Sequence, residues 1–289
     1  MSKPHPKTGR KGAAFPTVAY LGPEGTYSHI VAEKRYGHRA HLVPLASVLE
    51  ICLFVTEEPG SRRGIVPIEN SSGGAIYETV DILLENHPPV CVLEEISLNV
   101  RLALLGRKGE KIKVLYSHFA PLEHCNTWIR KRLPQVVAHV VSSTAVAAQR
   151  AAVERYSGAL ASRRQAGMTG LDVIEYPVQA DIPNITVFLA LGGHRRIQPG
   201  AAKTSLALKL PNKPGALCTF LEAFRDQNVN LSRLISRPLR GCPREYAFLV
   251  DVDGAAGDAP VQRAMNIARP DCVELRVVGA YPTQRQYTS

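Results

Sequence analysis

The chain has 289 residues, of which 45% are hydrophobic and 21% charged, and its formal net charge is +10. This length suits about two domains of roughly 100–200 residues each, and the composition is that of a globular rather than a disordered protein. No apolar run approaches the ~18–20 residues of a membrane-spanning helix, and no apolar stretch follows the basic start MSKPHPKTGRKG, so we expect neither a membrane anchor nor a signal peptide.

The first two-thirds of the chain repeat the order strand, polar turn, helix. The polar turns GPEGTYS and ENSSGG follow the apolar strands Thr17–Leu21 and Arg63–Ile68. This alternation predicts a parallel α/β sheet, with ligands at the carboxyl ends of the strands, where helix N-termini converge. The other elements expected here are strands at Ala40–Pro44, Val90–Leu105, Val114–Ser117, Val137–Val141, Ala159–Ala161 and Val187–Leu191, and helices at Ser28–Tyr36, Ser47–Phe54, Ala75–Leu84, Leu122–Arg132 and Ser143–Tyr156.

After a linker at 193–202 the pattern changes to the order βαββαβ, which is typical of a ferredoxin-like domain. The expected elements are strands at Thr204–Leu210, Val229–Ile235, Glu245–Val252 and Val273–Val278, and helices at Pro214–Asp226 and Val261–Ile267. We therefore divide the chain into a disordered basic tail at 1–16, a two-lobed α/β domain at 17–192, the linker at 193–202, a second domain at 203–282 and a tail at 283–289.

Charge and cysteine content restrict the partners. The six cysteines are scattered without a CxxC pair, which favours reduced thiols in the cytoplasm over zinc or a disulfide framework. The positive charge would attract an acidic partner. Because no helix-turn-helix, zinc-finger or RNP pattern is found, we expect a small dianion rather than nucleic acid. No dinucleotide fingerprint or metal-ligand spacing is present, so no cofactor and no metal are expected.

Several long motifs in order resemble the prephenate dehydratase family, over about Thr17 to Tyr281. They are YLGPEGTYSH (Tyr20–His29), GIVPIENSSGG (Gly64–Gly74) followed by Thr79 and Asp81, LYSH (Leu115–His118), SSTAVAA (Ser142–Ala148), and Asn184–Phe188 at the place of a Thr-Arg-Phe motif. The resemblance implies a two-lobed periplasmic-binding-protein-like catalytic domain followed by a ferredoxin-like βαββαβ ACT domain. The ACT residues that match phenylalanine-binding elements are Gly215, Ala216 and Leu217, and Ser236, Arg237 and Pro238.

The resemblance also implies a substrate and a set of site residues. The family reaction removes carbon dioxide and the ring hydroxyl of prephenate together. Thr186 keeps the position that assists the hydroxyl, and His118 matches a motif residue that would orient the substrate. The residues expected around the substrate are Thr26, Ser28, Asn70, Ser71, Ser72, Ser117, Ser143, Thr144, Val187 and Phe188.

The chain departs from the family pattern at a few positions. Val187 replaces the arginine of the Thr-Arg-Phe motif, and Ala120 and His124 replace two glutamines after Ser117-His118. If the missing arginine faced the ring carboxylate, an apolar side chain there would favour decarboxylation, because the localised charge of the ground state would lose more stabilisation than the dispersed transition state. His124 would offer a proton to a ring carbon.

We therefore expect a prephenate-utilising lyase, and favour a non-aromatising prephenate decarboxylase of secondary metabolism such as antibiotic biosynthesis. One alternative is a prephenate dehydratase that forms phenylpyruvate for phenylalanine synthesis. Another is a catalytically silent amino-acid sensor. Ile235 replaces the glutamate that opens the regulatory motif. Phenylalanine is therefore a candidate ligand with weak or absent inhibition, and the ACT domain is expected mainly to form a homodimer or homotetramer.

Overall fold

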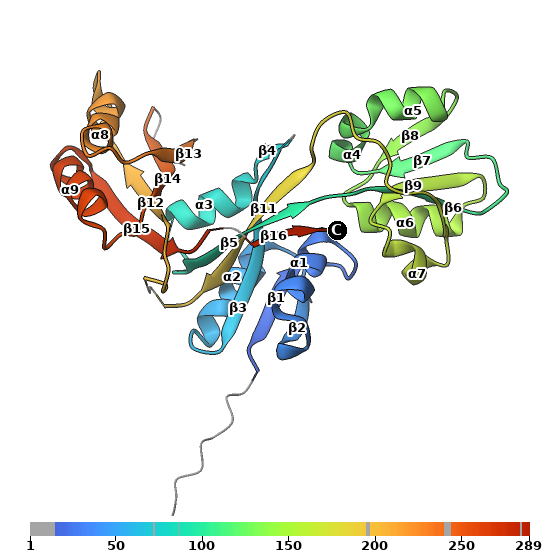
Figure 1. Ribbon diagram of the computed structural model, residues 1–289, viewed down its shortest axis with the longest axis horizontal. Coiled ribbons are helices and arrows are strands. Elements are labelled where there is room, and N and C mark those ends of the chain that lie inside the picture. Colours follow the sequence, from blue (N-terminus) through green and yellow to red (C-terminus); the bar gives the residue numbers. More distant parts are fainter. Residues whose placement is uncertain (1–14, 72, 86, 195–196, 240–243, 284) are drawn as a thin grey trace, which may run out of the picture.

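A computed structural model describes residues 15–71, 73–85, 87–194, 197–239, 244–283 and 285–289. They form three α/β units: lobe 1, lobe 2 and a ferredoxin-like second domain (Figure 1). Lobe 1 lies between the other two. Most of the expected basic tail, and Ser72, lie outside the described residues. None of the helices in the described ranges is long and apolar enough to cross a membrane.

Lobe 1 contains one mixed sheet with the strand order β16-β5-β11-β3-β1-β2, and the short strand β4 pairs with β3. Its strands are β1 (Thr17–Leu21), β2 (His41–Leu45), β3 (Arg62–Asn70), β4 (Gly74–Ala75), β5 (Cys91–Asn99), β11 (Ile185–Gly192) and β16 (Arg285–Thr288). Its helices are α1 (Tyr27–Tyr36), α2 (Val48–Glu57) and α3 (Tyr77–Glu85), with a 3-10 turn at Gly37–Arg39.

The direction of β11 corrects the expectation of a parallel sheet. Strands β2 and β3 run parallel to β1, as the strand–helix alternation predicts. Strand β11 is antiparallel to both of its neighbours, β3 and β5. The reason is topological: β5 leads out of lobe 1 toward lobe 2, and β11 brings the chain back beside it.

Lobe 2 is a smaller sheet with the order β10-β6-β9-β7-β8. Its strands are β6 (Ala103–Gly106), β7 (Val114–Ser117), β8 (Val137–Val140), β9 (Ser157–Ala161) and β10 (Asp172–Glu175), and its helices are α4 (Phe119–His124), α5 (Asn126–Arg132), α6 (Thr144–Val153) and α7 (Gln165–Thr169). The helix expected at Leu122–Arg132 is divided at Cys125, which ends α4 and precedes α5. No element was expected at β10 or α7.

The second domain has the predicted βαββαβ order. Its elements are β12 (Lys203–Lys209), α8 (Ala216–Arg225), β13 (Leu231–Pro238), β14 (Tyr246–Asp253), α9 (Ala259–Ala268), a 3-10 turn at Arg269–Asp271 and β15 (Glu274–Tyr281). The four strands form an antiparallel sheet in the order β13-β14-β12-β15. One sheet face packs with α8 and α9 around Phe220 and Phe224, and the other contributes Ala207, Leu249 and Val278 to a hydrophobic cluster shared with lobe 1.

The segment 283–289, expected as a tail, instead closes the edge of the lobe 1 sheet. Arg285–Thr288 form β16, which runs parallel to β5 and pairs Tyr287 with Leu98. Ser289 then accepts a hydrogen bond from the Tyr176 hydroxyl at 3.0 Å. The chain thus returns from the second domain to lobes 1 and 2.

The second domain approaches lobe 1 most closely where β15 crosses β5. Gly279 faces the backbone of Val92, and a Cβ atom added to Gly279 would overlap the Val92 carbonyl oxygen. Backbone atoms cannot yield as a flexible side chain can. Glycine at this position is therefore what permits the contact between the two sheets.

We predict that Gly279→Ala destabilises the protein by about 1–3 kcal/mol, because overpacking at this contact must displace one strand. The measurement is equilibrium denaturant unfolding. Gly257→Ala is the matched control, since nothing lies within 4 Å of a Cβ added to Gly257. Equal stability of the two variants would contradict the close approach.

Candidate active site

A cleft of about 690 Å³ lies between lobe 1 and lobe 2. Lobe 1 contributes the polar turn after β1, the end of β3 and the start of β11, and lobe 2 contributes the starts of α4 and α6. The polar side chains lining it are Thr26, Tyr27, Ser28, Asn70, Tyr77, His118, Ser142, Ser143, Thr144, Asn184 and Thr186. None of the described lining residues is a lysine, arginine, aspartate or glutamate.

Two ten-residue helices begin at the cleft. Thr26 caps α1, because its hydroxyl oxygen accepts from the His29 amide at 3.3 Å, and Ser143 caps α6 by accepting from the Val146 amide at 3.1 Å. A helix N-terminus carries unpaired amide hydrogens and a partial positive charge. The two starts therefore offer neutral donors to an anion in the cleft, one from each lobe.

Asn70, Asn184 and Thr186 form a hydrogen-bonded triplet at the end of β3 and the start of β11. The side-chain amide of Asn70 donates to the Thr186 hydroxyl at 2.9 Å and to the side-chain oxygen Oδ1 of Asn184 at 3.1 Å. The Thr186 oxygen is thus an acceptor toward Asn70. Because a hydroxyl has only one proton, that proton is directed away from Asn70 and can be donated to a molecule in the cleft.

His118 faces the same cleft from lobe 2. Its Nδ1 atom accepts from the Ala120 amide at 3.4 Å and so caps α4. Burial lowers the pKa of His118 below its usual 6.5, which favours the neutral ring near neutral pH. With Nδ1 acting as acceptor, the neutral ring carries its proton on Nε2 and is a hydrogen-bond donor there.

The structure brings most of the predicted site residues together but leaves several away from the cleft. The predicted residues that line it are Thr26, Ser28, Asn70, His118, Ser143, Thr144, Thr186 and Phe188. Ser71 instead joins two loops: its hydroxyl donates to the Pro183 carbonyl at 2.7 Å and accepts from the Ile185 amide at 3.0 Å. Ser72 lies outside the described residues.

The expectation that Val187 faces the substrate is corrected. Side chains alternate between the two faces of a strand, and Thr186 and Phe188 face the cleft. Val187 lies opposite Glu69 in the register of β3 and β11 and packs against the hydrophobic cluster between lobe 1 and the second domain. A replacement at position 187 therefore changes that packing rather than the wall of the cleft.

The positions of His124 and Ser117 are also corrected. Both are fully buried outside the residues that line the cleft, and neither His124 ring nitrogen has a hydrogen-bond partner among the described residues. The Ser117 hydroxyl oxygen is likewise without a partner in the described chain. His124 occupies the last turn of α4, which turns its ring into the interior of lobe 2.

Sequence reasoning missed Asn184 and the contacts that hold the lobes together. Asn184 is buried and two residues before Thr186, so its place beside a motif threonine was the available signal.

Across the lobes, the Ser162 hydroxyl donates to the Gly25 carbonyl at 3.3 Å. Gly25 has φ +79°, and an added Cβ would overlap the side-chain amide of Gln165, so a bulkier residue would strain the backbone and displace that side chain.

Comparison with known proteins identifies the family. A family model described as prephenate dehydratase matches residues 18–196. The chain belongs to the prephenate dehydratase family. A bifunctional chorismate mutase/prephenate dehydratase of Neisseria gonorrhoeae is 33% identical over 92% of this chain and 74% of that relative.

No group of three or more residues suited to a metal is found among the described residues.

Solved structures agree on the fold of this family member. The prephenate dehydratase of Arthrobacter aurescens, in complex with L-Phe, superposes with a TM-score of 0.82 at 28% identity, covering 92% of this chain and 90% of that one. A structure described as GqqA, a quorum-quenching acylase, superposes with a TM-score of 0.81 at 23% identity, covering 93% and 98% of the two chains. That second likeness concerns the fold alone, since one fold supports different chemistries.

We predict an acid loss of stability that depends on buried histidines. Burial lowers the pKa of His124, although Glu123 opposes the shift. The unfolded chain then binds the proton more readily, so stability is fully present above about pH 6.5 and decreases as the pH falls below it. His124→Leu should therefore show a smaller loss of melting temperature between pH 7.5 and 5.5 than the parent protein. The exposed His41→Gln is the control, and an unchanged loss in His124→Leu would contradict the assignment.

Proposed function

We propose that the protein is a prephenate dehydratase, which converts prephenate to phenylpyruvate, carbon dioxide and water. The observation that supports this most directly is the Thr186 hydroxyl in the cleft, which accepts from Asn70 at 2.9 Å and keeps its own proton for the substrate. A hydrogen bond from that proton to the ring hydroxyl of prephenate would assist the departure of a poor leaving group.

The electron flow of this reaction needs no redox partner. The bond between the ring and its carboxylate breaks, and its electron pair enters the ring as carbon dioxide leaves. The ring then expels the para hydroxyl, which takes up one proton and departs as water, and aromaticity results. Thr186 would donate toward that oxygen while the proton comes ultimately from solvent. His118, with a donor at Nε2, could hold a substrate oxygen from the opposite lobe.

The two carboxylates of prephenate would be bound by neutral donors. The starts of α1 and α6 face each other across the cleft, and hydroxyls of Thr26, Ser28, Ser143 and Thr144 lie beside them. Charge-assisted hydrogen bonds to backbone amides are about twice as strong as neutral ones. Both carboxylates of prephenate are carried by the ring carbon para to the hydroxyl, one directly and one through the pyruvyl side chain, and the cleft offers them one helix start from each lobe.

The net charge of the chain says little about how this dianion would be held. The described lining of the cleft has no charged side chain apart from a titratable histidine, and several arginines are committed to the boundary with the second domain. Carboxylates in such a cleft would depend on helix starts and hydroxyls, whose donors are fixed in direction and cost little to reorganise. Binding of this kind is sensitive to small displacements, so what holds the strand ends in place matters for the chemistry.

Decarboxylation without loss of the hydroxyl receives less support. That hypothesis depended on an apolar side chain at position 187 facing the ring carboxylate and on His124 as the acid. Val187 packs on the opposite face of β11, and His124 is buried away from the cleft. The Neisseria and Arthrobacter relatives also carry the dehydratase name.

We further propose that the second domain is an ACT domain that binds phenylalanine, the amino acid found in complex with the Arthrobacter relative. Gly215, with φ +81°, begins α8, and Ala216 and Leu217 follow in its first turn. Ser236 and Pro238 lie on the exposed side of β13, whereas Arg237 turns inward to Asp81. Ile235 packs inward as well, on the face of β13 opposite Ser236 and Pro238.

We predict that the purified protein forms phenylpyruvate from prephenate and that Thr186→Val lowers kcat by about 10²–10⁴-fold, because the isosteric side chain has no proton to donate. Phenylpyruvate is detected as the aromatic enol in alkali. Thr56→Val, at a half-buried threonine of α2 that does not line the cleft, is the control and should retain full activity. A product that keeps the ring hydroxyl would instead identify a decarboxylase, and no turnover would favour a silent sensor.

We predict that Val187→Arg leaves the identity of the product unchanged. The side chain would enter the interface between lobe 1 and the second domain, opposite Glu69 in the register of β3 and β11, rather than the cleft. A lower melting temperature is expected, since a charge would be placed against apolar residues. Chromatographic product analysis is the measurement. A shift between aromatic and non-aromatic products would show that position 187 reaches the substrate after all.

A further inference from the structure

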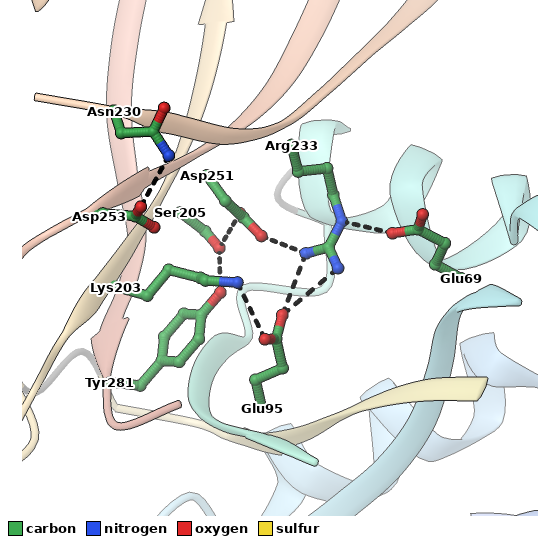
Figure 2. Close-up of polar contacts among 9 residues, drawn as sticks. All are labelled: Glu69, Glu95, Lys203, Ser205, Asn230, Arg233, Asp251, Asp253 and Tyr281. Carbon is green, nitrogen blue, oxygen red and sulfur yellow. Dashed lines mark hydrogen bonds and ion pairs between the residues drawn. The ribbon is translucent and has the colours of Figure 1, made fainter. Parts of the chain in front are cut away.

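The side of β13 that faces lobe 1 carries a buried arginine with three carboxylate partners. Figure 2 shows Arg233 pointing between Glu69, Glu95 and Asp251. Its Nε atom lies 3.0 Å from Glu69 Oε2, both terminal nitrogens lie 3.3 Å from Glu95 Oε2, and Nη1 also donates to Asp251. The side chain is only 9% exposed, so these interactions are little screened by water.

Two of the three carboxylates are held independently of Glu69. Lys203 binds Glu95 at 2.9 Å, and the Ser205 hydroxyl donates to Asp251 at 2.5 Å. Glu95 and Asp251 are 4% and 0% exposed. Glu95 and Asp251 bind the two terminal nitrogens of the guanidinium, and its Nε atom is directed at Glu69. A planar fork with five donors can meet three acceptors at once, which a single ammonium group cannot.

Glu69 is next to the candidate active site in the chain. It is followed directly by Asn70, whose amide donates to Thr186. The ladder between β3 and β11 is irregular here, because its register shifts between Val187 and Phe188. Beyond this bulge, Glu69 and Asn70 pair again with β11 on one side and with β4 on the other. The Glu69 side chain adds a further link on the face toward the second domain, and its partner there is Arg233.

We propose that Arg233 is a positioning residue for the candidate active site: through Glu69 it holds the end of β3, so that the Asn70 amide stays on the Thr186 hydroxyl. The proposal rests on the proposed function for its kinetic consequence. A residue of the second domain thereby sets the geometry of a group in the cleft without touching the substrate. A displacement of β13 relative to lobe 1 would thus reach Glu69 and, through it, Asn70.

Glu69→Gln is the sharpest variant. Its carboxylate is 43% exposed, so the neutral amide weakens the link to Arg233 without leaving a buried charge unpaired. We expect kcat for prephenate to fall by about 10- to 100-fold, as a misplacement on the order of 1 Å can do, with KM little changed. Arg233→Lys should have a similar effect, and the double variant should be no worse than the poorer single one, because both changes break one link.

Arg276→Gln is the matched control for general loosening of the domains. Arg276 lies on β15, is 10% exposed, and donates across the same boundary to the Leu83 and Leu84 carbonyls at 2.8 and 3.1 Å. It has no route to Asn70 through the contacts above. We expect this variant to lose melting temperature and to keep kcat. If kcat falls as far in Arg276→Gln as in Glu69→Gln, the specific role of Arg233 is overturned.

Amide hydrogen–deuterium exchange tests the link without any turnover. The Ser71 amide donates to the Ile185 carbonyl at 2.8 Å and reports on the junction of β3 and β11. Exchange at residues 69–71 should become faster in Glu69→Gln and Arg233→Lys but not in Arg276→Gln. If the parent protein leaves prephenate unchanged, the proposed function fails while this measurement still decides the link. Unchanged exchange in both variants, with only the melting temperature lowered, would refute the positioning role.

Discussion

The two-residue period of strand β11 divides its side chains between the cleft and the boundary with the second domain. Thr186 and Phe188 face the cleft, and Val187, between them, packs toward the second domain. Because successive residues of a strand share one extended backbone, a movement of the backbone caused by packing at Val187 also moves Thr186 and Phe188. The hydroxyl that would act on the substrate and the packing that would respond to the second domain are therefore parts of one short segment.

Much of the fold could be predicted from local pattern, and its failures have a common cause. The polar turns after β1 and β3 and the βαββαβ order were visible because turn residues and apolar periodicity are local signals. The antiparallel direction of β11 and the strand β16 were not visible. Their partner is β5, and β16 lies nearly 190 residues away from it in the chain, pairing Arg285 with Ile96. A four-residue polar strand has no signal of its own when its pairing is supplied by a distant partner.

The candidate site shows the same division between local and non-local information. Motif matching predicted Thr186, Asn70 and His118, whose residue types suit hydrogen bonding in any orientation. It could not predict which face of the sheet the Val187 side chain is on. A one-residue change of register moves a side chain to the opposite face, and the pairing of β3 with β11 has a bulge directly after Val187. His124 was misjudged because a position in a helix gives no depth of burial until the neighbouring helix is known.

The two departures at positions 187 and 235 are best understood together. In the family pattern they carry an arginine and a glutamate, and here Val187 and Ile235 both pack against one hydrophobic cluster between lobe 1 and the second domain. A single charge left in that environment would be costly without a partner. Replacing both removes one positive and one negative group from the same boundary, so the local charge balance is kept. The change then concerns how the second domain is held against β11, where Arg233 provides one of the ionic links, and it leaves the donors of the cleft as they are.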